Sequence, residues 1–309
     1  MIQREHRVPR ICVLMASYNG ADFIADQIAT ILHQQDVEVT LFIRDDGSSD
    51  ATPDIIAAEA QRDARVRVMD PQGISTGSAA RNFLRMLGTV DFGDADYVAL
   101  ADQDDFWLSH KLRRAVERIE RERAGGYSAN LVAFDNDGLR APWLLRKHDQ
   151  PRRFDHFFQG ASAGCTYVLS RTAADAMRPW LATLEFPADY GISHDWLIYA
   201  FVRNRALRWV YDDAALILYR QHSANVYGAQ PGLRSVAAHI KLLRTHWYRR
   251  HVLWVASQLD LSAEEQALAR RVARGTLADR LWLLAHASQL RRRPRDALML
   301  RLAIATGLF

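Results

Sequence analysis

Short apolar runs alternate with helix-like segments through the first hundred residues, and this alternation limits the fold more than any other feature. The apolar runs cover residues 11–16, 39–44, 66–69 and 96–101, and they are rich in strand-forming side chains. The segments between them, such as ADFIADQIATILHQ and SAARNFLRML, carry apolar residues at helical spacing. Strands and helices that alternate at this spacing form βαβ units. The sequence therefore predicts an α/β fold, Rossmann-like, with a mostly parallel central sheet and helices on both faces.

The composition is that of a globular protein. Of 309 residues, 49% are hydrophobic and 25% are charged, which is enough apolar material for a substantial core. The formal net charge of +4 is too small to identify a partner. Cys12 and Cys165 show neither metal-binding nor disulfide spacing, and no run approaches the ~18 apolar residues of a membrane span. We expect a cytoplasmic protein without a signal peptide or a transmembrane segment.

The chain changes character near Gly228. From residue 232 onward strand-like runs disappear, and apolar residues recur at helical intervals among arginines. We expect an α/β domain over 1–228 and an amphipathic helical region over 229–309. The tryptophans, leucines and arginines of this region fit two arrangements, helices that pack on the protein itself or a basic amphipathic surface that lies on an anionic membrane.

Three predicted strands end in polar residues. SYNG at 17–20 follows the first strand, DDGS at 45–48 the second, and DQDD at 102–105 the last. The carboxyl ends of strands in an open α/β sheet form the edge where ligands bind, so we expect these residues to meet in one crevice. DDGS is also a good turn and helix-capping sequence, and this interpretation stays open beside ligand binding.

The three carboxylates of DQDD repel one another unless they are protonated or bridged by a cation. Their hard oxygen atoms favour Mg²⁺ or Mn²⁺. An EF-hand is excluded, because Trp107 stands where that loop requires glycine and Arg113 where it requires glutamate. The sequence contains neither a GxxxxGK[ST] nor a GxGxxG motif, so any phosphate must be held by metal and cationic side chains.

Six segments stand in the order typical of glycosyltransferase family 2, and the chain resembles its bacterial rhamnosyltransferase-like branch. They are MASYNGADFIADQIATIL, IRDDGSSDAT, STGSAARN, LADQDDFWLSHKL, SHDW and LYRQHSANVYG, and the resemblance covers about residues 10 to 228. It implies a GT-A fold, a nucleotide-diphospho-sugar donor, a divalent metal and inversion at the anomeric carbon. It also implies a dTDP- or UDP-linked donor, with rhamnose from dTDP-rhamnose as the favoured sugar.

The resemblance assigns the donor to side chains at the strand ends. The implied donor-binding residues are Ser17, Tyr18, Asp45, Asp46, Arg81, Asp102, Gln103 and Arg220. Asp45 or Asp46 would accept hydrogen bonds from a pyrimidine base or ribose, and Arg220 would pair with the diphosphate. The implied metal ligands are Asp104, Asp102 and His222. Arg81 has the alternative role of an ordinary helix-surface arginine.

Asp195, in the SHDW segment, matches the family's catalytic base, which takes a proton from the acceptor hydroxyl. The alternative is an aspartate that only stabilises a helix N-terminus beside Ser193. His194 replaces the glutamate of many relatives and would tune Asp195. The implied acceptor-side residues are Asp105, Trp107, Gly164, His194 and Trp196, together with Gly160. Packing is the simpler interpretation of Trp107, and solvation of a helix surface that of Lys111.

The resemblance implies a saccharide or lipid-linked acceptor in cell-surface polysaccharide or lipopolysaccharide synthesis, and peripheral contact with the cytoplasmic face of the inner membrane. One rival is a nucleotide-sugar hydrolase or nucleotidyltransferase, which needs no acceptor base. Another is a catalytically silent nucleotide-sugar-binding subunit of a membrane complex. Nucleic acid is a poor partner, because the acidic region that would face phosphate lacks a basic, aromatic platform.

Overall fold

The computed structural model describes residues 7–69, 75–136, 138, 140–147, 149–222 and 245–309. The chain divides into two compact units. The first, the sheet unit, comprises residues 1–148, 162–183 and 207–220, and the second, the helical unit, comprises 149–161, 184–206 and 221–309. The boundary expected near Gly228 falls outside the described residues, and the division at that point stays a prediction.

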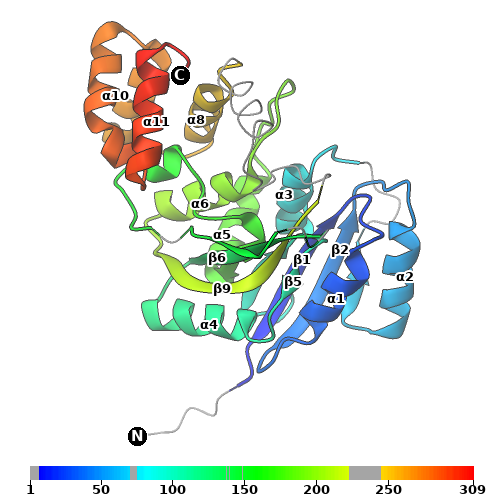
Figure 1. Ribbon diagram of the computed structural model, residues 1–309. Coiled ribbons are helices and arrows are strands. Elements are labelled where there is room, and N and C mark those ends of the chain that lie inside the picture. Colours follow the sequence, from blue (N-terminus) through cyan, green and yellow to red (C-terminus); the bar gives the residue numbers. More distant parts are fainter. Residues whose placement is uncertain (1–6, 70–74, 137, 139, 148, 223–244) are drawn as a thin grey trace, which may run out of the picture. The chain divides into compact units, whose positions relative to one another are not determined.

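One mixed sheet organises the sheet unit (Figure 1). Its strand order is β3-β2-β1-β4-β8-β6-β9-β5, with β7 paired to β6. The parallel part consists of β1 (Arg10–Ser17), β2 (Glu38–Asp45), β3 (Val66–Val68) and β4 (Tyr97–Ala101). These strands confirm the four that the sequence predicts.

The rest of the sheet contains antiparallel pairs, β4 with β8, β8 with β6, β6 with β7 and β9 with β5. Its strands are β5 (Phe106–Trp107), β6 (Gly126–Asp135), β7 (Trp143–Leu145), β8 (Val168–Ser170) and β9 (Trp209–Gln221). The short helix η2 (Gly164–Thr166) precedes β8. The sheet is therefore more mixed in its second half than strand and helix alternation alone indicates.

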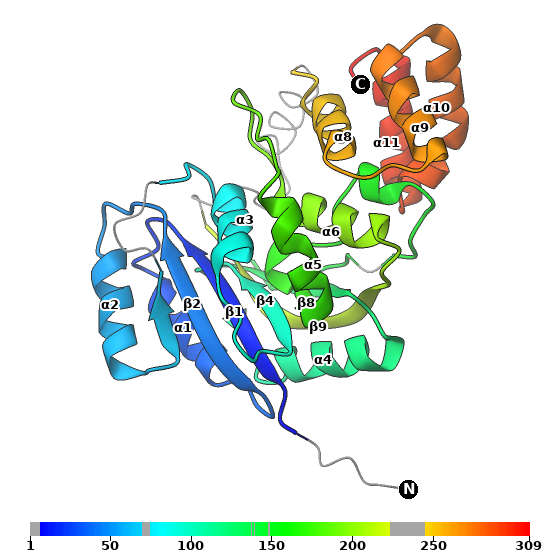
Figure 2. The same ribbon diagram turned by 180° about the vertical axis from the view of Figure 1, so that it is seen from behind.

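Helices cover both faces of this sheet. Figure 1 shows α1 (Ile24–Leu32) in front of the parallel strands, and Figure 2 shows α3 (Ala79–Thr89) and α5 (Arg171–Leu181) on the opposite face. Alternate residues of β1, Ile11, Val13 and Met15, share a buried core with α1 and α4. Helix α4 spans Lys111–Glu122, and α2 (Thr52–Arg62) packs against α1 and β3.

The helical unit contains η1 (Asp155–Phe157), α6 (His194–Asn204), α8 (Trp247–Ser257), α9 (Ala263–Arg274), α10 (Leu277–Leu290) and α11 (Pro294–Ala305). Local sequence sets several of the ends. Ser262 and Glu265 form a capping box at the start of α9, Gly275 ends that helix at a φ of +61°, and Thr276 caps α10. The predicted helical character after residue 232 is confirmed for residues 247–305. Within the described residues, no helix combines the length and the hydropathy needed to cross a membrane.

Candidate functional site

The register of the parallel strands brings their polar ends together. Ser17 pairs with Asp45 across β1 and β2, and Met15 pairs with Ala101 across β1 and β4. The DQDD loop, which starts at Asp102, therefore leaves the sheet beside the other two strand ends. Ser17 is buried and its hydroxyl donates to Asp45 Oδ1 at 3.0 Å. The predicted convergence of three strand ends is confirmed.

Asp45 shapes the turn that follows β2. Its Oδ2 atom accepts from the backbone N–H groups of Gly47 and Ser48 at 3.1 and 2.8 Å, and its Oδ1 atom accepts from the Ser48 hydroxyl at 2.5 Å. The turn-forming interpretation of DDGS thus describes the contacts of this residue. Helix α2 itself begins without a side-chain cap.

Asp46 points into the protein and holds the start of the STGS segment. Its carboxylate accepts from Arg44 Nη1 at 2.9 Å, from the Thr76 N–H at 2.7 Å and from the Gly77 N–H at 2.9 Å. Burial opposes ionisation, but these hydrogen bonds outweigh it and lower the pKa of Asp46. Arg44 is itself buried and also reaches Asn82 on α3. Asp46 therefore shapes the edge of the site through this segment.

Gln103 fixes the loop after β1. Its side-chain amide accepts from the Tyr18 N–H and donates to the Tyr18 carbonyl, both at 2.9 Å. The Tyr18 side chain remains 58% exposed at this edge of the sheet. A side chain at position 20 would clash with this contact, since a Cβ on Gly20 would lie 2.2 Å from Gln103 Oε1.

Asp105 is fully buried, whereas Asp102 and Asp104 are half-buried. Burial, with added repulsion from Asp104 and Asp102, raises the pKa of Asp105 well above its usual range. Its Oδ2 atom receives no hydrogen bond from the described residues. Its other contacts are a hydrogen bond from the Cys165 thiol and one from the Arg220 N–H at 3.3 Å.

Among the described residues, one group of three potential metal ligands lies together, formed by Asp102, Asp105 and Cys165, with their ligand atoms within 4.8 Å of one another. Burial raises the pKa of the Cys165 thiol well above its usual range, so the thiol stays protonated and is a poor ligand. The remaining donors are carboxylate oxygens, which fit Mg²⁺ or Mn²⁺. Asp104 and His222 lie outside this group, and metal binding by them stays a prediction.

Arg220 holds the DQDD loop from β9. Its Nε donates to the Asp104 carbonyl at 3.0 Å, and its Nη1 donates to Asn136 Oδ1 at 2.7 Å. The guanidinium lies 4.7 Å from the ring centroid of Phe23 and 4.6 Å from that of Phe106. These contacts make Arg220 a support of the acidic loop, while its pairing with a diphosphate stays a prediction.

Lys111 is buried, so the interpretation of this residue as a solvated helix lysine is wrong. Its Nζ lies 3.4 Å from the centroid of the Trp107 ring, which is itself buried, as the packing interpretation predicts. Burial lowers the pKa of Lys111 to about 7, although Cys165 and Asp105 oppose this shift. The lysine is the first residue of α4, and the sequence gives no sign of its burial because the preceding residues are polar.

Asp195 lies in the helical unit, in the first turn of α6. Its Oδ1 atom accepts from the Trp196 N–H at 2.8 Å and from the Ser193 hydroxyl. In the described part of the chain both hydrogen bonds reach Oδ1, which leaves Oδ2 to receive a proton. Burial lowers the pKa of His194, against the pull of Asp195, and this favours a neutral imidazole. Trp196 is buried, and its indole donates to the His156 carbonyl at 2.9 Å.

Helix α8 holds the segment that precedes Asp195. The indole N–H groups of Trp254 and Trp247 donate to the carbonyls of Glu185 and Gly191, each at 2.8 Å. Arg250 pairs with Asp189 on the same segment. Helix α8 thus shapes the approach to the predicted base.

The remaining predicted residues are distributed over both units. Arg81 is half-buried in the first turn of α3, and Gly164 is buried at the start of η2, both in the sheet unit. Gly160 and His222 belong to the helical unit. Sequence patterns gave no indication of Asp155, a fully buried carboxylate of this unit that contacts α6, because it stands alone among polar and aromatic residues.

Comparisons with known proteins agree with this geometry. The model of the family described as "Glycosyl transferase family 2" matches residues 12–175, more than half of the chain. The dTDP-rhamnosyl transferase RfbG of Shigella flexneri is 30% identical over 96% of this chain and 100% of its own length. The putative teichuronic acid biosynthesis glycosyltransferase TuaG of Bacillus subtilis is 28% identical over 69% of this chain and 88% of its own.

Solved structures show the same fold. The S. aureus TarS 1–349 structure in complex with UDP-GlcNAc has a TM-score of 0.58 at 14% identity, over 97% of this chain and 80% of that one. This likeness supports the GT-A fold that the sequence predicts. Together with the family match and the relative that aligns along nearly the whole chain, it leads to one conclusion. The chain belongs to glycosyltransferase family 2, is similar to bacterial rhamnosyltransferases, and is a glycosyltransferase.

Proposed function

We propose that this glycosyltransferase transfers rhamnose from dTDP-rhamnose to a saccharide or lipid-linked acceptor in cell-surface polysaccharide synthesis, with inversion at the anomeric carbon. The observation that carries the proposal is the 30% identity with a dTDP-rhamnosyl transferase over 100% of that relative's length. Such an alignment includes the helical unit as well as the sheet unit. An alignment confined to the sheet unit would be weaker support for rhamnose as the transferred sugar.

The donor nucleotide binds at the converging strand ends. Ser17, Asp45 and Asp46 line the nucleoside site, and the exposed ring of Tyr18 offers a surface for the base or ribose. Arg81 and Arg220 supply positive charge for the diphosphate. A nucleotide-sugar donor is in keeping with the TarS structure in complex with UDP-GlcNAc.

Asp102 and Asp104 would hold a divalent ion, and Asp102 belongs to the group of potential ligands that also contains Asp105. The Oδ2 atom of Asp105 is buried and receives no hydrogen bond from the described residues, which fits a carboxylate beside a cation. His222 completes the ligand set that the family resemblance implies. When bound, such an ion neutralises diphosphate charge and makes the nucleoside diphosphate a competent leaving group. The chain's own contribution is to hold the carboxylates in place through Arg220 and Gln103.

Asp195 acts as the base. Its Oδ2 takes the proton of the acceptor hydroxyl, while the hydrogen bonds from Trp196 N–H and Ser193 to Oδ1 orient the carboxylate. The neutral His194 beside it adds no competing charge. The acceptor oxygen attacks the anomeric carbon from the face opposite the diphosphate, so the configuration at that carbon inverts.

The C-terminal helices contact the cytoplasmic face of the inner membrane. Five large apolar side chains on α10 and α11 are more than half exposed: Leu277, Leu281, Leu298, Met299 and Leu302. Basic residues such as Arg280 and Arg295 are exposed on the same helices and suit an anionic leaflet. Co-sedimentation with vesicles of phosphatidylglycerol and phosphatidylcholine tests this, and the proposal fails if Leu281→Glu and Leu298→Glu together leave sedimentation unchanged.

Calorimetric titration tests the donor and the metal. The wild type is titrated with dTDP, UDP and GDP, each with and without Mn²⁺, beside Asp104→Ala and the control Asp213→Ala, whose carboxylate is 79% exposed. We expect Mn²⁺-dependent binding of dTDP that Asp104→Ala loses and Asp213→Ala keeps. Preference for UDP would move the proposal to another sugar. Absence of nucleotide binding would overturn it.

Product analysis tests the reaction. The enzyme, dTDP-β-L-rhamnose and a panel of p-nitrophenyl glycosides are incubated, and NMR gives the anomeric configuration of the product. We expect an α-rhamnoside, a rate at least about a hundredfold lower in Asp195→Asn, and full activity in Asp260→Asn, a control in the same unit whose side chain is 88% exposed. Free rhamnose as the main product would identify a hydrolase instead.

A further inference from the structure

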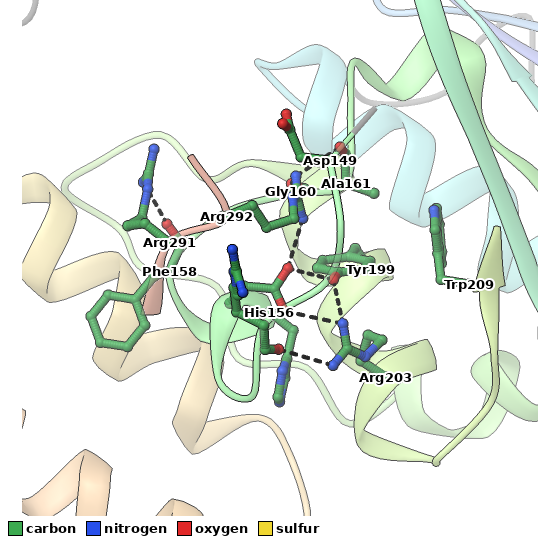
Figure 3. Close-up of polar contacts among 12 residues, drawn as sticks. Asp149, His156, Phe158, Gly160, Ala161, Tyr199, Arg203, Trp209, Arg291 and Arg292 are labelled. Carbon is green, nitrogen blue, oxygen red and sulfur yellow. Dashed lines mark hydrogen bonds and ion pairs between the residues drawn. The ribbon is translucent and has the colours of Figure 1, made fainter. Parts of the chain in front are cut away.

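Three side chains of α6 bind one short segment of the same unit, and Figure 3 shows two of them, Tyr199 and Arg203. They are Trp196, Tyr199 and Arg203, whose spacing puts them on one face of the helix. The Trp196 indole donates to the His156 carbonyl at 2.9 Å. The Tyr199 hydroxyl donates to Asp155 Oδ2 at 2.8 Å, and Arg203 Nη1 donates to Asp155 Oδ1 at 3.1 Å. The helix is therefore tied along about two of its turns.

Arg292, in the connection between α10 and α11, binds the same carboxylate from the C-terminal region. Its Nη1 donates to Asp155 Oδ2 at 2.8 Å. Its Nη2 donates to the carbonyls of Gly160 and Ala161 at 2.6 and 2.8 Å. Figure 3 shows its guanidinium between these carbonyls and the Tyr199 hydroxyl. One arginine thus fixes the segment 155–161, to which α6 is attached.

Moving or neutralising the buried Asp155 carboxylate would destabilise the contacts around it. Asp155 is fully buried, and Arg292 and Arg203 are 7% and 20% exposed at their side chains. If the Asp155 charge were removed, two guanidinium groups would face each other with little water to screen them. Rotation of α6 about its axis would break the hydrogen bonds of Trp196, Tyr199 and Arg203 together.

Asp195 precedes Trp196 on this helix, so the rotation of α6 sets the direction of its carboxylate. A base that is misdirected by about 1 Å loses on the order of a hundredfold in rate. We propose that Asp155 and Arg292 are positioning residues for Asp195, and that the α10–α11 connection serves catalysis by fixing the rotation of α6. The inference rests on Asp195 being the base of the proposed function.

The helical unit offers a matched control. Asp279 is also a buried aspartate with two arginine partners, Arg274 at 2.8 Å and Arg271 at 3.4 Å, and it joins α9 to α10. None of its described hydrogen bonds involves α6. Asp279→Asn therefore disturbs the unit by the same chemistry without touching the predicted base.

The test compares Arg292→Lys, Tyr199→Phe, Asp155→Asn and Asp279→Asn with dTDP-rhamnose as donor and p-nitrophenyl glycosides as acceptors. We expect the first three to lower kcat at least about tenfold with little change in the donor KM. Asp279→Asn lowers the Tm but keeps kcat. The inference is overturned if all four variants lose activity only in proportion to their unfolded fraction.

A double variant separates this inference from the proposed function. If Tyr199 acts through Asp195, then Tyr199→Phe has no further effect on the residual rate of Asp195→Asn, whereas a merely structural role gives multiplied losses. Tyr199→Phe removes one hydroxyl and keeps the ring, so it serves if Asp155→Asn does not fold. Full activity in Asp195→Asn would refute the role of Asp195 as the base, and with it the proposed mechanism. If Asp195→Asn is strongly impaired while Tyr199→Phe and Arg292→Lys keep full activity, only the positioning role is refuted.

Discussion

Arg114 on α4 donates two hydrogen bonds to Asp212 on β9, from Nε to Oδ2 at 2.6 Å and from Nη2 to Oδ1 at 2.9 Å. Arg118, one turn along the helix, adds a third at 2.6 Å, and the Tyr127 hydroxyl adds a fourth at 2.9 Å. The carboxylate is fully buried. This cluster attaches α4 to the strand that carries Arg220.

Asp212→Asn is expected to lower the free energy of unfolding by about 3 kcal/mol, because two arginines lose their buried counter-charge. Burial alone would raise the pKa of Asp212, but the hydrogen bonds from Arg114 and Tyr127 and the charge of Arg118 lower it to about 2. A carboxylate with a depressed pKa stabilises the fold above its unfolded pKa of 3.8, and this contribution is lost as pH falls through about 2.

Urea unfolding between pH 2 and 6 checks both points. The acid-dependent loss of stability over this range is expected to be smaller in Asp212→Asn than in the wild type. Asp213→Asn is the control, since that neighbouring carboxylate is 79% exposed, and it should change stability by less than about 0.5 kcal/mol. Equal effects of the two variants would contradict the role of the cluster.

Gly20→Ala is expected to weaken donor binding. The new Cβ would lie 2.2 Å from Gln103 Oε1, so the Gln103 side chain must move and release the backbone of Tyr18. Loss of these two hydrogen bonds should raise the Kd for dTDP by about tenfold, measured by calorimetry. Gly88→Ala is the control, because the nearest atom to its Cβ would lie at an ordinary 3.7 Å. Unchanged affinity in Gly20→Ala would show that the Gln103 contact does not shape the site.

Lys111→Met is expected to change how stability depends on pH. Burial lowers the pKa of Lys111 to about 7, from 10.5 when unfolded. Between these values the unfolded chain binds more protons than the folded one, so this group makes wild-type stability rise with pH. The methionine variant should lack this rise, and the exposed Lys147→Met should keep it. The test is the free energy of unfolding measured from pH 7 to 10. If it depends on pH in the same way in the wild type and in Lys111→Met, the expectation is refuted.

Trp254→Phe should loosen the segment before Asp195. The phenyl ring keeps most of the packing but cannot donate to the Glu185 carbonyl, a loss of about 1 kcal/mol. Amide hydrogen exchange of residues 184–193 should accelerate severalfold. Trp282→Phe, on α10, is the control, since its ring stacks on His286 within that helix. Equal exchange of this segment in both variants would show that α8 does not hold it.

Much of the sheet unit follows from the sequence. The strands that end near Ser17, Asp45 and Asp102 are apolar runs separated by helical segments, and parallel register then places their ends together. Among the antiparallel strands after residue 105, β5, β7 and β8 escape prediction because they have two or three residues each and no periodicity to detect.

The direction of a side chain is harder to predict than its place in the chain. Asp45 and Asp46 are neighbours with the same chemistry, yet one closes its own turn and the other is enclosed by Thr76 and Gly77. Thr76 and Gly77 lie about thirty residues from Asp46, and no local pattern connects them to it. Lys111 differs in that its partner is near in sequence, since its ammonium group lies over the ring of Trp107.

The distance in sequence between Asp155 and Arg292 has a consequence for biosynthesis. The ribosome adds Asp155 to the chain 137 residues before it adds Arg292. At ordinary translation rates this interval lasts on the order of ten seconds. During that interval the described strands of the sheet unit are completed, the last of them β9 at Gln221, while Asp155 still lacks Arg292. The described sheet unit is therefore made before Arg292, and the helical unit that carries Asp195 can form its Asp155–Arg292 pair only afterwards.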